Sequence, residues 1–581
     1  MPSNGLKKEY KMINSMVKTV LQNLTIRDIL EAINKKYGQR PALRVKTKDG
    51  RLKDISYVKL GRRVVTVSSA LMELGVKKAD KVAILSENRP EWALAYFGII
   101  SCAGIVVPID VKLSTKEIQF IMNDSRVKCV FVSAKYIPVI DELKTVLPNL
   151  EHIILLDRAG RGDVMLLKNL SRHRGKQRGR PVYPDDTSLI VYTSGTTGVA
   201  KGVEISYRNL LFQVLAFSEI IHSSPDDNLL SVLPLNHMLE ITGGLIAPLY
   251  GGACITYSDN LKAGTLLPLM KETKTTVMIC VPLVLKLMHG GIMKKIARLS
   301  PGRRKAFGAA LALSRALLKL NVRVGKALFA PIHEEFGGHL RGFISGGAPL
   351  DADVEVDLNA LGFRVLQGYG LTETAPVISV NTFNNNKFAS VGKPLSGVEV
   401  KILKKNKFSR EGEIITRGPH VMKGYFNNPE KTAEVIRGGW LHTGDIGYFD
   451  RDNFLLISGR IKNLIVLGTG KKVFPEEVEA VMEKSPYIKE ISVLGRIAGR
   501  GIRKGHEEVY AVIVPDLEAF GESESPDSEN IRKKISAEVS RLGRNLAEYK
   551  RITDFQIRFQ ELPRTVTKKI KRKAVREMIN V

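Results

Sequence analysis

The stretch Tyr192-Thr193-Ser194-Gly195-Thr196-Thr197-Gly198-Val199-Ala200-Lys201-Gly202 is the most informative part of this chain. It follows an apolar run, Ser188 to Val191, that predicts a buried strand. Glycines let backbone N–H groups converge, hydroxyls donate to phosphate oxygens or reach Mg²⁺, and a lysine offsets anionic charge. The stretch therefore predicts a loop that holds the phosphates of a nucleotide after a strand of an α/β fold.

Two alternatives to this interpretation concern the same residues. The spacing contains no Gly-x-x-x-x-Gly-Lys-Ser/Thr pattern, so a P-loop ATPase fold is disfavoured. A surface turn rich in glycine and threonine remains the plain structural alternative, because these residues also form ordinary loops.

Length and composition indicate a globular protein of several domains. The chain has 581 residues, of which 44% are hydrophobic and 25% charged, and this is too long for a single core. Its four cysteines lie in apolar surroundings without a Cys-x-x-Cys pair: Cys102, Cys129, Cys254 and Cys280. They predict buried thiols in a reducing compartment rather than disulfides or a zinc site.

The net charge of +30 attracts polyanions, among them nucleotides, CoA, anionic lipids and nucleic acids. Nucleic acid is not the predicted partner, since no zinc finger, helix-turn-helix signature or RNA-binding aromatic motif accompanies the basic residues. The uncharged stretch from Trp92 to Ile109 approaches the length of a membrane span, but glycines and Pro108 interrupt it. We expect a buried helix running into a strand, and a cytoplasmic protein that contacts the inner face of the membrane at most peripherally.

The order of apolar runs predicts the fold class. Short apolar strands separated by helical patterns indicate a largely parallel sheet with both faces covered; they are Lys81–Leu85, Val106–Pro108, Val130–Val132 and Ile153–Leu156. After Lys462 the pattern changes to a short acidic helix, short strands and a further helix. We therefore predict an α/β protein with a large N-terminal domain of mixed, mostly parallel sheets layered with helices over residues 1–460, and a small α+β domain over 461–581.

One segment, about 289–340, departs from this alternation of strands and helices, because its lysines and arginines alternate with apolar residues. The pattern predicts a pair of basic amphipathic helices that suit an anionic membrane surface. A solvated helical insertion packed on the body explains it equally well.

Further motifs follow strand-like runs, where ligands bind in open α/β sheets. They are the turn Gly346-Gly347-Ala348-Pro349 and the segment Gln367-Gly368-Tyr369-Gly370 with Thr372 and Glu373. Tyr369 can offer a flat face to a base, and Thr372 and Glu373 can serve phosphate and metal. Tight turns that close strands are the alternative.

Charged residues near the C-terminal third form the last candidates. The Asp445 carboxylate can hold both hydroxyls of a ribose, and Arg460 can hold the ribose edge or a phosphate, with charged surface turns as the alternative. The basic stretch from Leu562 to Lys573 is either a tail or a loop that carries a lysine into an active site. His237 follows an apolar strand, where a lone histidine is usually structural.

Taken together, these motifs resemble the AMP-forming acyl-adenylate synthetases over nearly the whole chain and in the family's order. The resemblance matches segments to functions as follows: Tyr192–Gly202 to the phosphate loop, Gly346–Pro349 and Gln367–Thr374 to the adenine and metal segments, Asp445 to the ribose ligand, Arg460–Asn463 to the hinge region, and Thr565–Arg572 to the catalytic lysine loop.

The resemblance implies a reaction in two steps. A carboxylate attacks the α-phosphorus of Mg·ATP to give acyl-AMP and pyrophosphate, and a thiol then displaces AMP. Lys569 would bridge carboxylate and α-phosphate oxygens, Thr193 and Glu373 would hold Mg²⁺, and Lys201 would hold the departing phosphates. Lys462 corresponds to the hinge of a mobile small domain, and His237 to a residue that gates or lines the thioester site.

This sequence departs from the family pattern at four positions. Ala200 replaces a usual proline, Asn463 an aspartate, Arg564 a lysine and Lys568 a glycine. The proline only stiffens a turn, so its loss should be tolerated. We assign the catalytic role to Lys569 rather than Lys568 because Lys569 keeps its place before Ile570 and Arg572.

Within this superfamily the chain looks most like bacterial long-chain fatty acid–CoA ligases, through Gln367–Val380 with Asn381, the basic insertion before Arg341, and Gly392–Gly397. The resemblance implies medium- to long-chain fatty acids as substrates, with ATP, Mg²⁺ and CoA. One alternative is an acyl–acyl carrier protein synthetase or fatty acyl-AMP ligase, which would pass the acyl group to an acyl carrier protein, whose acidic surface suits a basic chain. Another is an inactive basic scaffold that binds lipid. Chain length and oligomeric state are not predicted.

Overall fold

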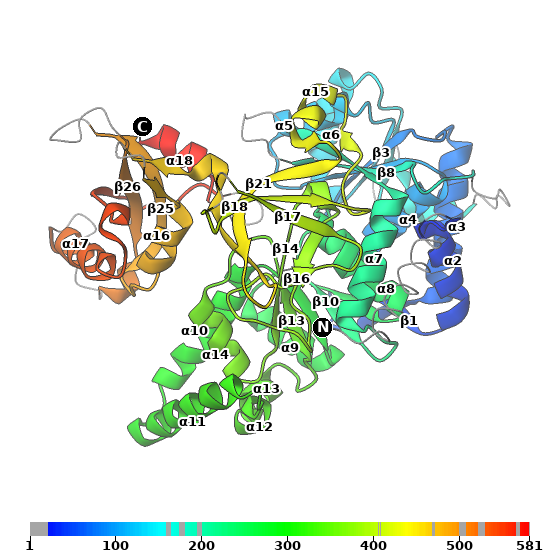
Figure 1. Ribbon diagram of the computed structural model, residues 1–581. Coiled ribbons are helices and arrows are strands. Elements are labelled where there is room, and N and C mark those ends of the chain that lie inside the picture. The colour runs from blue at the N-terminus through cyan, green and yellow to red at the C-terminus, as the bar shows by residue number, and fades with distance from the viewer. Residues whose placement is uncertain are drawn as a thin grey trace, which may run out of the picture. The chain divides into compact units, whose positions relative to one another are not determined.

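The structure is a computed structural model that describes residues 21, 23–157, 164–172, 180–193, 200–258, 260–404, 406, 408–467, 471–498, 507–520, 529–564 and 570–579. It divides into two compact units, Met1–Val400 with Thr416–Leu441, and Lys401–Ile415 with His442–Val581 (Figure 1). The second unit thus takes in two segments that the predicted boundary at 460 assigns to the first domain.

The first unit contains an eight-stranded sheet in the order β19-β9-β8-β4-β3-β5-β6-β7. It is parallel from β8 to β7, and β9 and β19 join its edge as antiparallel strands. Its strands are β3 (Lys81–Leu85), β4 (Ile105–Ile109), β5 (Cys129–Val132), β6 (His152–Leu155), β7 (Met165–Leu166), β8 (Thr187–Thr193), β9 (Lys201–Ser206) and β19 (Gly424–Tyr425).

A nine-stranded sheet forms the rest of the unit's framework, in the order β16-β15-β14-β13-β12-β10-β11-β1-β2. It is parallel from β14 to β1. Its strands are β1 (Pro41–Lys46), β2 (Leu52–Ser56), β10 (Asn228–Ser231), β11 (Cys254–Tyr257), β12 (Val277–Cys280), β13 (Gly342–Ser345), β14 (Val365–Gly370), β15 (Val377–Val380) and β16 (Lys393–Pro394). The predicted fold class of mostly parallel sheets layered with helices is confirmed.

The helices of this unit follow the expected alternation. They are α2 (Ile26–Tyr37), α3 (Tyr57–Glu73), α4 (Pro90–Ser101), α5 (Thr115–Asp124), α6 (Ile137–Leu143), α7 (Tyr207–Ile221), α8 (Ala247–Gly251), α9 (Ala263–Thr273), α10 (Pro282–Ala297), α11 (Pro301–Lys319), α12 (Gly325–Leu328), α13 (Ala330–Glu335), α14 (Ala352–Ala360) and α15 (Pro429–Val435). Helix α4 is buried on nearly all sides and leads into β4, as predicted for the apolar stretch after Trp92. Among the helices of the described residues, none has both the length and the apolar character needed to cross a bilayer.

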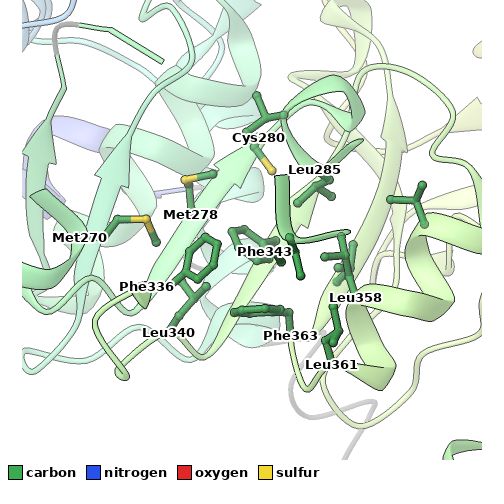
Figure 2. Packing of buried hydrophobic residues seen from close by; sticks show 14 of the residues in the cluster. Met270, Met278, Cys280, Leu285, Phe336, Leu340, Phe343, Leu358, Leu361 and Phe363 are labelled. Carbon is green, nitrogen blue, oxygen red and sulfur yellow. The ribbon is translucent and has the colours of Figure 1, made fainter. Parts of the chain in front are cut away.

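The four cysteines are buried free thiols, as predicted. Cys280 belongs to an apolar core in which side chains of β12 and β13 meet those of α10 and α14, including Met278, Phe343, Leu285 and Leu358 (Figure 2).

The basic insertion is built on this same core. It begins before residue 289, at α10, and comprises four helices rather than the predicted pair, α10 to α13. Leu311 and Leu318 of α11 are buried in the same apolar cluster as Cys280, and Phe307 packs against it. The alternative of a helical insertion packed on the body therefore holds for this apolar face of α11.

The second unit contains the small α+β domain. Its sheet has the order β25-β26-β27, with β25 and β26 antiparallel and β26 and β27 parallel. Helices α16 and α17 cover it with Val478, Met482 and Ile535. The unit's elements are β22 (Leu455–Arg460), η6 (Ile461–Asn463), β23 (Ile465–Val466), β24 (Lys472–Val473), α16 (Pro475–Met482), β25 (Ile488–Ile497), β26 (Glu507–Pro515), α17 (Glu529–Gly543), β27 (Asp554–Ile557) and α18 (Arg572–Met578); the strands β17 (Glu399–Lys404), β18 (Gly412–Arg417) and β21 (Trp440–Phe449) supply further residues to it.

Candidate functional site

A β-hairpin carries the predicted phosphate loop. Strands β8 and β9 pair antiparallel, and Thr193 lies directly opposite Lys201. The loop residues Ser194, Gly195, Thr196, Thr197 and Gly198 lie outside the described residues. A strand–loop–strand arrangement differs from the strand–loop–helix of a P-loop, so it agrees with the exclusion of the Walker pattern.

Tyr425 brings two predicted site residues together. The Lys201 Nζ lies 5.2 Å from the centroid of the Tyr425 ring. The Tyr425 hydroxyl donates to Glu373 Oε1 over 2.9 Å. Burial, with the nearby Glu373 carboxylate, raises the pKa of Tyr425, so the phenol stays protonated and donates at neutral pH. Thr193, Lys201 and Glu373 therefore gather at one edge of the eight-stranded sheet.

Tyr425 was not predicted as a site residue. It reaches the site because β19 pairs with β9, which sets Tyr425 opposite Val203, a residue far away along the chain. The backbone of Glu373 is fixed by the same segment, since Met422 N donates to its carbonyl over 2.9 Å. No local spacing in the sequence signals such a pairing.

The turn Gly346–Pro349 follows β13 at the carboxyl edge of the nine-stranded sheet, as predicted. A Cβ on Gly346 would lie 3.3 Å from Leu239 Cδ2 and 3.6 Å from the Gly368 carbonyl oxygen, so three chain segments meet there. Gly347 has a φ of +87°, which favours glycine. The structure thus brings this turn to the end of β14.

The second glycine segment differs from its prediction, because Gln367, Gly368, Tyr369 and Gly370 belong to strand β14 itself and not to a turn after it. Only Thr372 and Glu373 lie beyond it, in the short helix η5 (Thr372–Thr374). The strand continues because β15 pairs with it, with Tyr369 opposite Ser379.

Gln367 is engaged by a buried acid. Its side-chain amide donates to Glu355 Oε2 over 2.8 Å, and Ala389 N donates to the same oxygen over 2.9 Å. Burial raises the pKa of Glu355 to about 7. Gln367 therefore fixes β14 against α14, and its predicted contact with nucleotide stays a prediction.

His237 lies on a turn after β10 that polar contacts hold in place. Its Nε2 is 3.8 Å from Asp110 Oδ2, and Asn236 donates to that same oxygen over 3.2 Å. Leu235 N donates to Asn88 Oδ1 over 2.9 Å. The turn thus contacts Asp110 after β4 of the eight-stranded sheet and Asn88 before α4, and it follows β10 of the nine-stranded sheet.

Glu240, three residues after His237, is an acid that sequence reasoning missed. It is fully buried at the start of the π-helix η4 (Glu240–Ile246), and Ser231 Oγ donates to its Oε1 over 2.5 Å. Burial raises the pKa of Glu240 to about 8. A Cβ on Gly244 would lie 2.4 Å from Glu240 Cδ, so the glycine makes room for the carboxyl group. π-Helices often mark functional sites.

We expect Glu240→Gln to stabilise the first unit strongly at pH 8 and only slightly at pH 5. Between pH 4.5 and about 8 the folded protein keeps a proton that the unfolded chain releases, so stability falls as pH rises through this range. The gain should be on the order of 4 kcal/mol at pH 8 and below about 1 kcal/mol at pH 5. Tryptophan fluorescence during urea unfolding measures it, since both tryptophans, Trp92 and Trp440, lie in the first unit. Identical pH slopes for the two proteins would contradict the prediction.

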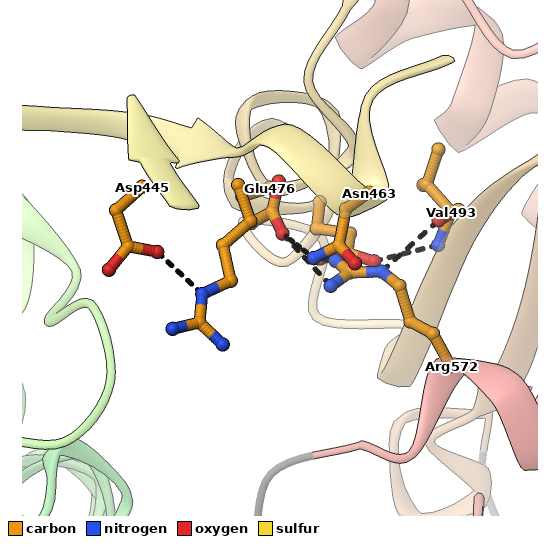
Figure 3. A network of polar contacts seen from close by, with 7 residues as sticks. Asp445, Asn463, Glu476, Val493 and Arg572 are labelled. Atoms are coloured by element: carbon orange, nitrogen blue, oxygen red, sulfur yellow. Dashed lines mark hydrogen bonds and ion pairs between the residues drawn. The ribbon is translucent and has the colours of Figure 1, made fainter. Parts of the chain in front are cut away.

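In the second unit the structure brings Asp445 and Arg460 together. They lie opposite each other on β21 and β22, and Arg460 Nε donates to Asp445 Oδ1 (Figure 3). Asp445 is buried, whereas 49% of the Arg460 side chain is exposed. Lys462 follows on η6 as an exposed residue. A buried carboxylate with an adjacent arginine suits a ribose and its phosphate.

The segment 565–569, including Lys568 and Lys569, lies outside the described residues, but the residues on either side of it are held together. Arg564 and Ile570 form an antiparallel bridge, and Lys571 N donates to the Pro563 carbonyl over 2.7 Å. Arg564 also pairs with Glu490 over 3.0 Å. Both ends of the predicted lysine loop are therefore anchored at one place on the domain.

Comparison with known proteins matches the two parts of the chain to family models. Residues 30–426 match the AMP-binding enzyme family, and residues 462–580 match the AMP-binding enzyme C-terminal domain. Fatty acyl-CoA synthetase B of Dictyostelium discoideum is 30% identical over 505 residues, covering 81% of this chain and 75% of that protein. Long-chain-fatty-acid–CoA ligase FadD15 of Mycobacterium bovis is 29% identical over 499 residues, covering 81% of this chain and 79% of that protein.

Two further matches bear on the acceptor and the fold. The chloroplastic long-chain-fatty-acid–[acyl-carrier-protein] ligase AEE15 of Arabidopsis thaliana is 28% identical over 588 residues, covering 88% of this chain and 78% of that protein. The crystal structure of the anthranilate CoA ligase AuaEII with anthranoyl-AMP superimposes with a TM-score of 0.79 at 23% identity, covering 96% of this chain and 98% of that one. This last match shows a shared fold.

Proposed function

Because the chain belongs to the AMP-binding enzyme family, we propose that it activates medium- to long-chain fatty acids with ATP and passes the acyl group to CoA. The reaction of this family forms an acyl-adenylate with release of pyrophosphate, and a thiol then displaces AMP. The observation that carries the proposal for this chain is the gathering of Thr193, Lys201 and Glu373 around Tyr425.

In the first step, Lys201 would hold the β- and γ-phosphates as they depart. Glu373 and the Thr193 hydroxyl would hold Mg²⁺. Within the described residues no group of three His, Cys, Asp or Glu side chains forms a metal site, and this fits Mg²⁺, which commonly takes one or two protein oxygens together with substrate phosphates. When bound, Mg²⁺ neutralises phosphate charge. Tyr425 keeps the Glu373 carboxylate oriented through its hydrogen bond.

Lys569 would act in acyl-adenylate formation, and His237 would act in the thiol step. The Lys569 ammonium group would lie between the attacking carboxylate and the α-phosphate, where negative charge develops in the transition state. His237 would line the path of the thiol, because it follows β10 and Leu239, two residues further on, reaches the turn at Gly346. Asp445 and Arg460 would hold the ribose, and Lys462 would act as the hinge of the second unit.

The acceptor thiol is the main alternative within this chemistry. Acyl carrier proteins are acidic, and the net charge of +30 favours such a partner as well as CoA. AMP release from ATP and palmitate, with CoA and with acyl carrier protein offered separately, tests the two. A thioester with CoA supports the proposal, a product with carrier protein alone replaces it, and no pyrophosphate exchange at all would leave an inactive lipid-binding scaffold.

We also propose that the insertion contacts an anionic membrane surface. Its core-facing side is buried, yet several large apolar side chains point to solvent: Leu287, Leu299, Leu313, Leu320 and Leu328. The same segment carries exposed basic residues, among them Arg303, Arg304 and Lys305 at the start of α11. Exposed leucines beside arginines and lysines are suited to the interface of anionic lipids.

Charge reversal at Arg303, Arg304 and Lys305 tests this surface. We expect the triple glutamate variant to bind vesicles of phosphatidylglycerol and phosphatidylcholine at low salt at least about tenfold more weakly, because each basic residue near the surface contributes about 1 kcal/mol. Reversal of the exposed Arg532, Lys533 and Lys534 on α17 is the matched control. Equal losses in both variants would show binding through net charge alone and would contradict the proposal.

A further inference from the structure

The side chain of Glu476 connects two segments of the second unit that are far apart in sequence. Its Oε1 accepts a hydrogen bond from Asn463 Nδ2 over 2.6 Å and another from Arg572 Nη1 over 3.0 Å (Figure 3). Asn463 ends η6 in the hinge region, and Arg572 begins α18, three residues after Lys569. One carboxylate oxygen thus contacts both the hinge segment and the anchor of the lysine segment.

Arg572 also contacts Glu479, which in turn is hydrogen-bonded to strand β25 of the sheet. Its Nη2 donates to Glu479 Oε2, and Val493 N donates to Glu479 Oε1 over 2.7 Å. Burial alone would lower the pKa of Arg572, but the attraction of Glu479 and Glu476 outweighs it and raises the pKa. Two carboxylates face one guanidinium in this partly buried place, and burial raises the pKa of Glu479 to about 7.

Asn463 completes this arrangement in a way that an aspartate could not. An amide donates to Glu476, whereas a carboxylate at the same position would face Glu476 at hydrogen-bond distance and repel it. Gly459 on β22 also packs closely here, since a Cβ on it would lie 3.1 Å from Glu476 Oε2. The departure of residue 463 from the family's usual aspartate is therefore matched to the carboxylate on α16.

From this geometry we infer that Glu476 is a positioning residue: it joins the hinge segment Ile461–Asn463 to α18, the helix that follows the lysine segment, and acyl-adenylate formation depends on this connection. The inference rests on the proposed function for its chemistry. Arg572 is the intermediary, because it anchors α18 and lies close in sequence to the lysine. The thiol step does not use Lys569 but does use the hinge, so a change at Glu476 should affect it less than acyl-adenylate formation.

The test uses the full chain with four variants: Asn463→Asp, Glu476→Gln, the double variant with both, and Glu477→Gln. Glu477 is the matched control, because it lies next to Glu476 on α16 and pairs with Lys550 instead. Two rates are measured, ATP–pyrophosphate exchange with palmitate and AMP release from preformed palmitoyl-AMP with CoA. Trypsin cleavage within Lys568–Lys573, followed by mass spectrometry, is a readout that needs no activity.

We expect Asn463→Asp to lower exchange about tenfold, as for the loss of one charged hydrogen bond, and to slow the thiol step by a smaller factor. The double variant should recover most of the loss, since the amide introduced at position 476 can donate to the carboxylate introduced at position 463. Cleavage should be faster in Asn463→Asp and return to normal in the double variant.

Three results would overturn the inference: Asn463→Asp behaving like Glu477→Gln, equal losses in both half-reactions, or no recovery in the double variant. Absence of exchange in the unchanged protein would instead overturn the proposed function, and the cleavage pattern would then still decide the role of Glu476.

Discussion

Replacing Lys569 by alanine is expected to lower ATP–pyrophosphate exchange with a fatty acid by about 10²–10³-fold, the cost of removing one group that stabilises transition-state charge. The ammonium group would act only while the carboxylate attacks the α-phosphate. The rate of AMP release from preformed acyl-AMP and CoA should therefore stay near that of the unchanged protein. Exchange and release are measured on the same preparations.

Lys568→Ala is the matched control for this experiment. Both lysines carry the same charge and lie within the segment whose flanks, Arg564 and Ile570, are bridged. A general loss of positive charge would affect both variants alike. If Lys568→Ala rather than Lys569→Ala abolishes exchange, the assignment moves by one residue. If both variants keep their activity, a lysine in this segment does not act in the first step.

Much of the fold could be predicted because its signals are local. The strands at Lys81–Leu85 and Val130–Val132 are short apolar runs, and their burial on both faces follows from parallel pairing with neighbours. The glycines and Pro108 correctly distinguished the buried helix α4 and strand β4 from a membrane span. Such features depend on residues that are close together in the chain.

Parts of the site could not be predicted, because they depend on contacts between distant segments. Tyr425 reaches Glu373 only through the pairing of β19 with β9. Gln367 meets Glu355 across two elements. Glu240 looks like any helical glutamate in sequence, and only its burial next to Ser231 distinguishes it. A residue type signals phosphate or ribose chemistry, but it does not show which neighbour will engage it.

A second large loss of exchange activity is expected for Glu373→Gln. Glutamine keeps the length of the side chain and an oxygen that can accept the Tyr425 hydroxyl, so the local structure should persist. It removes the charge that would attract Mg²⁺. We expect exchange to fall by on the order of 10²-fold at millimolar Mg²⁺ and to recover in part as Mg²⁺ is raised, which a titration of the exchange rate against Mg²⁺ measures.

Tyr425→Phe separates the charge of Glu373 from its orientation. The phenylalanine ring keeps the packing under Lys201, whereas the hydrogen bond to Glu373 is lost. Because only the orientation of Glu373 changes, the exchange rate should fall less than in Glu373→Gln, by about tenfold. The Mg²⁺ concentration required for half-maximal exchange should rise modestly. If Glu373→Gln instead shows unchanged Mg²⁺ dependence, the carboxylate does not hold the metal. Its contact with Tyr425 would then serve only to join η5 to β19, and the metal would have to be held by the phosphates and Thr193.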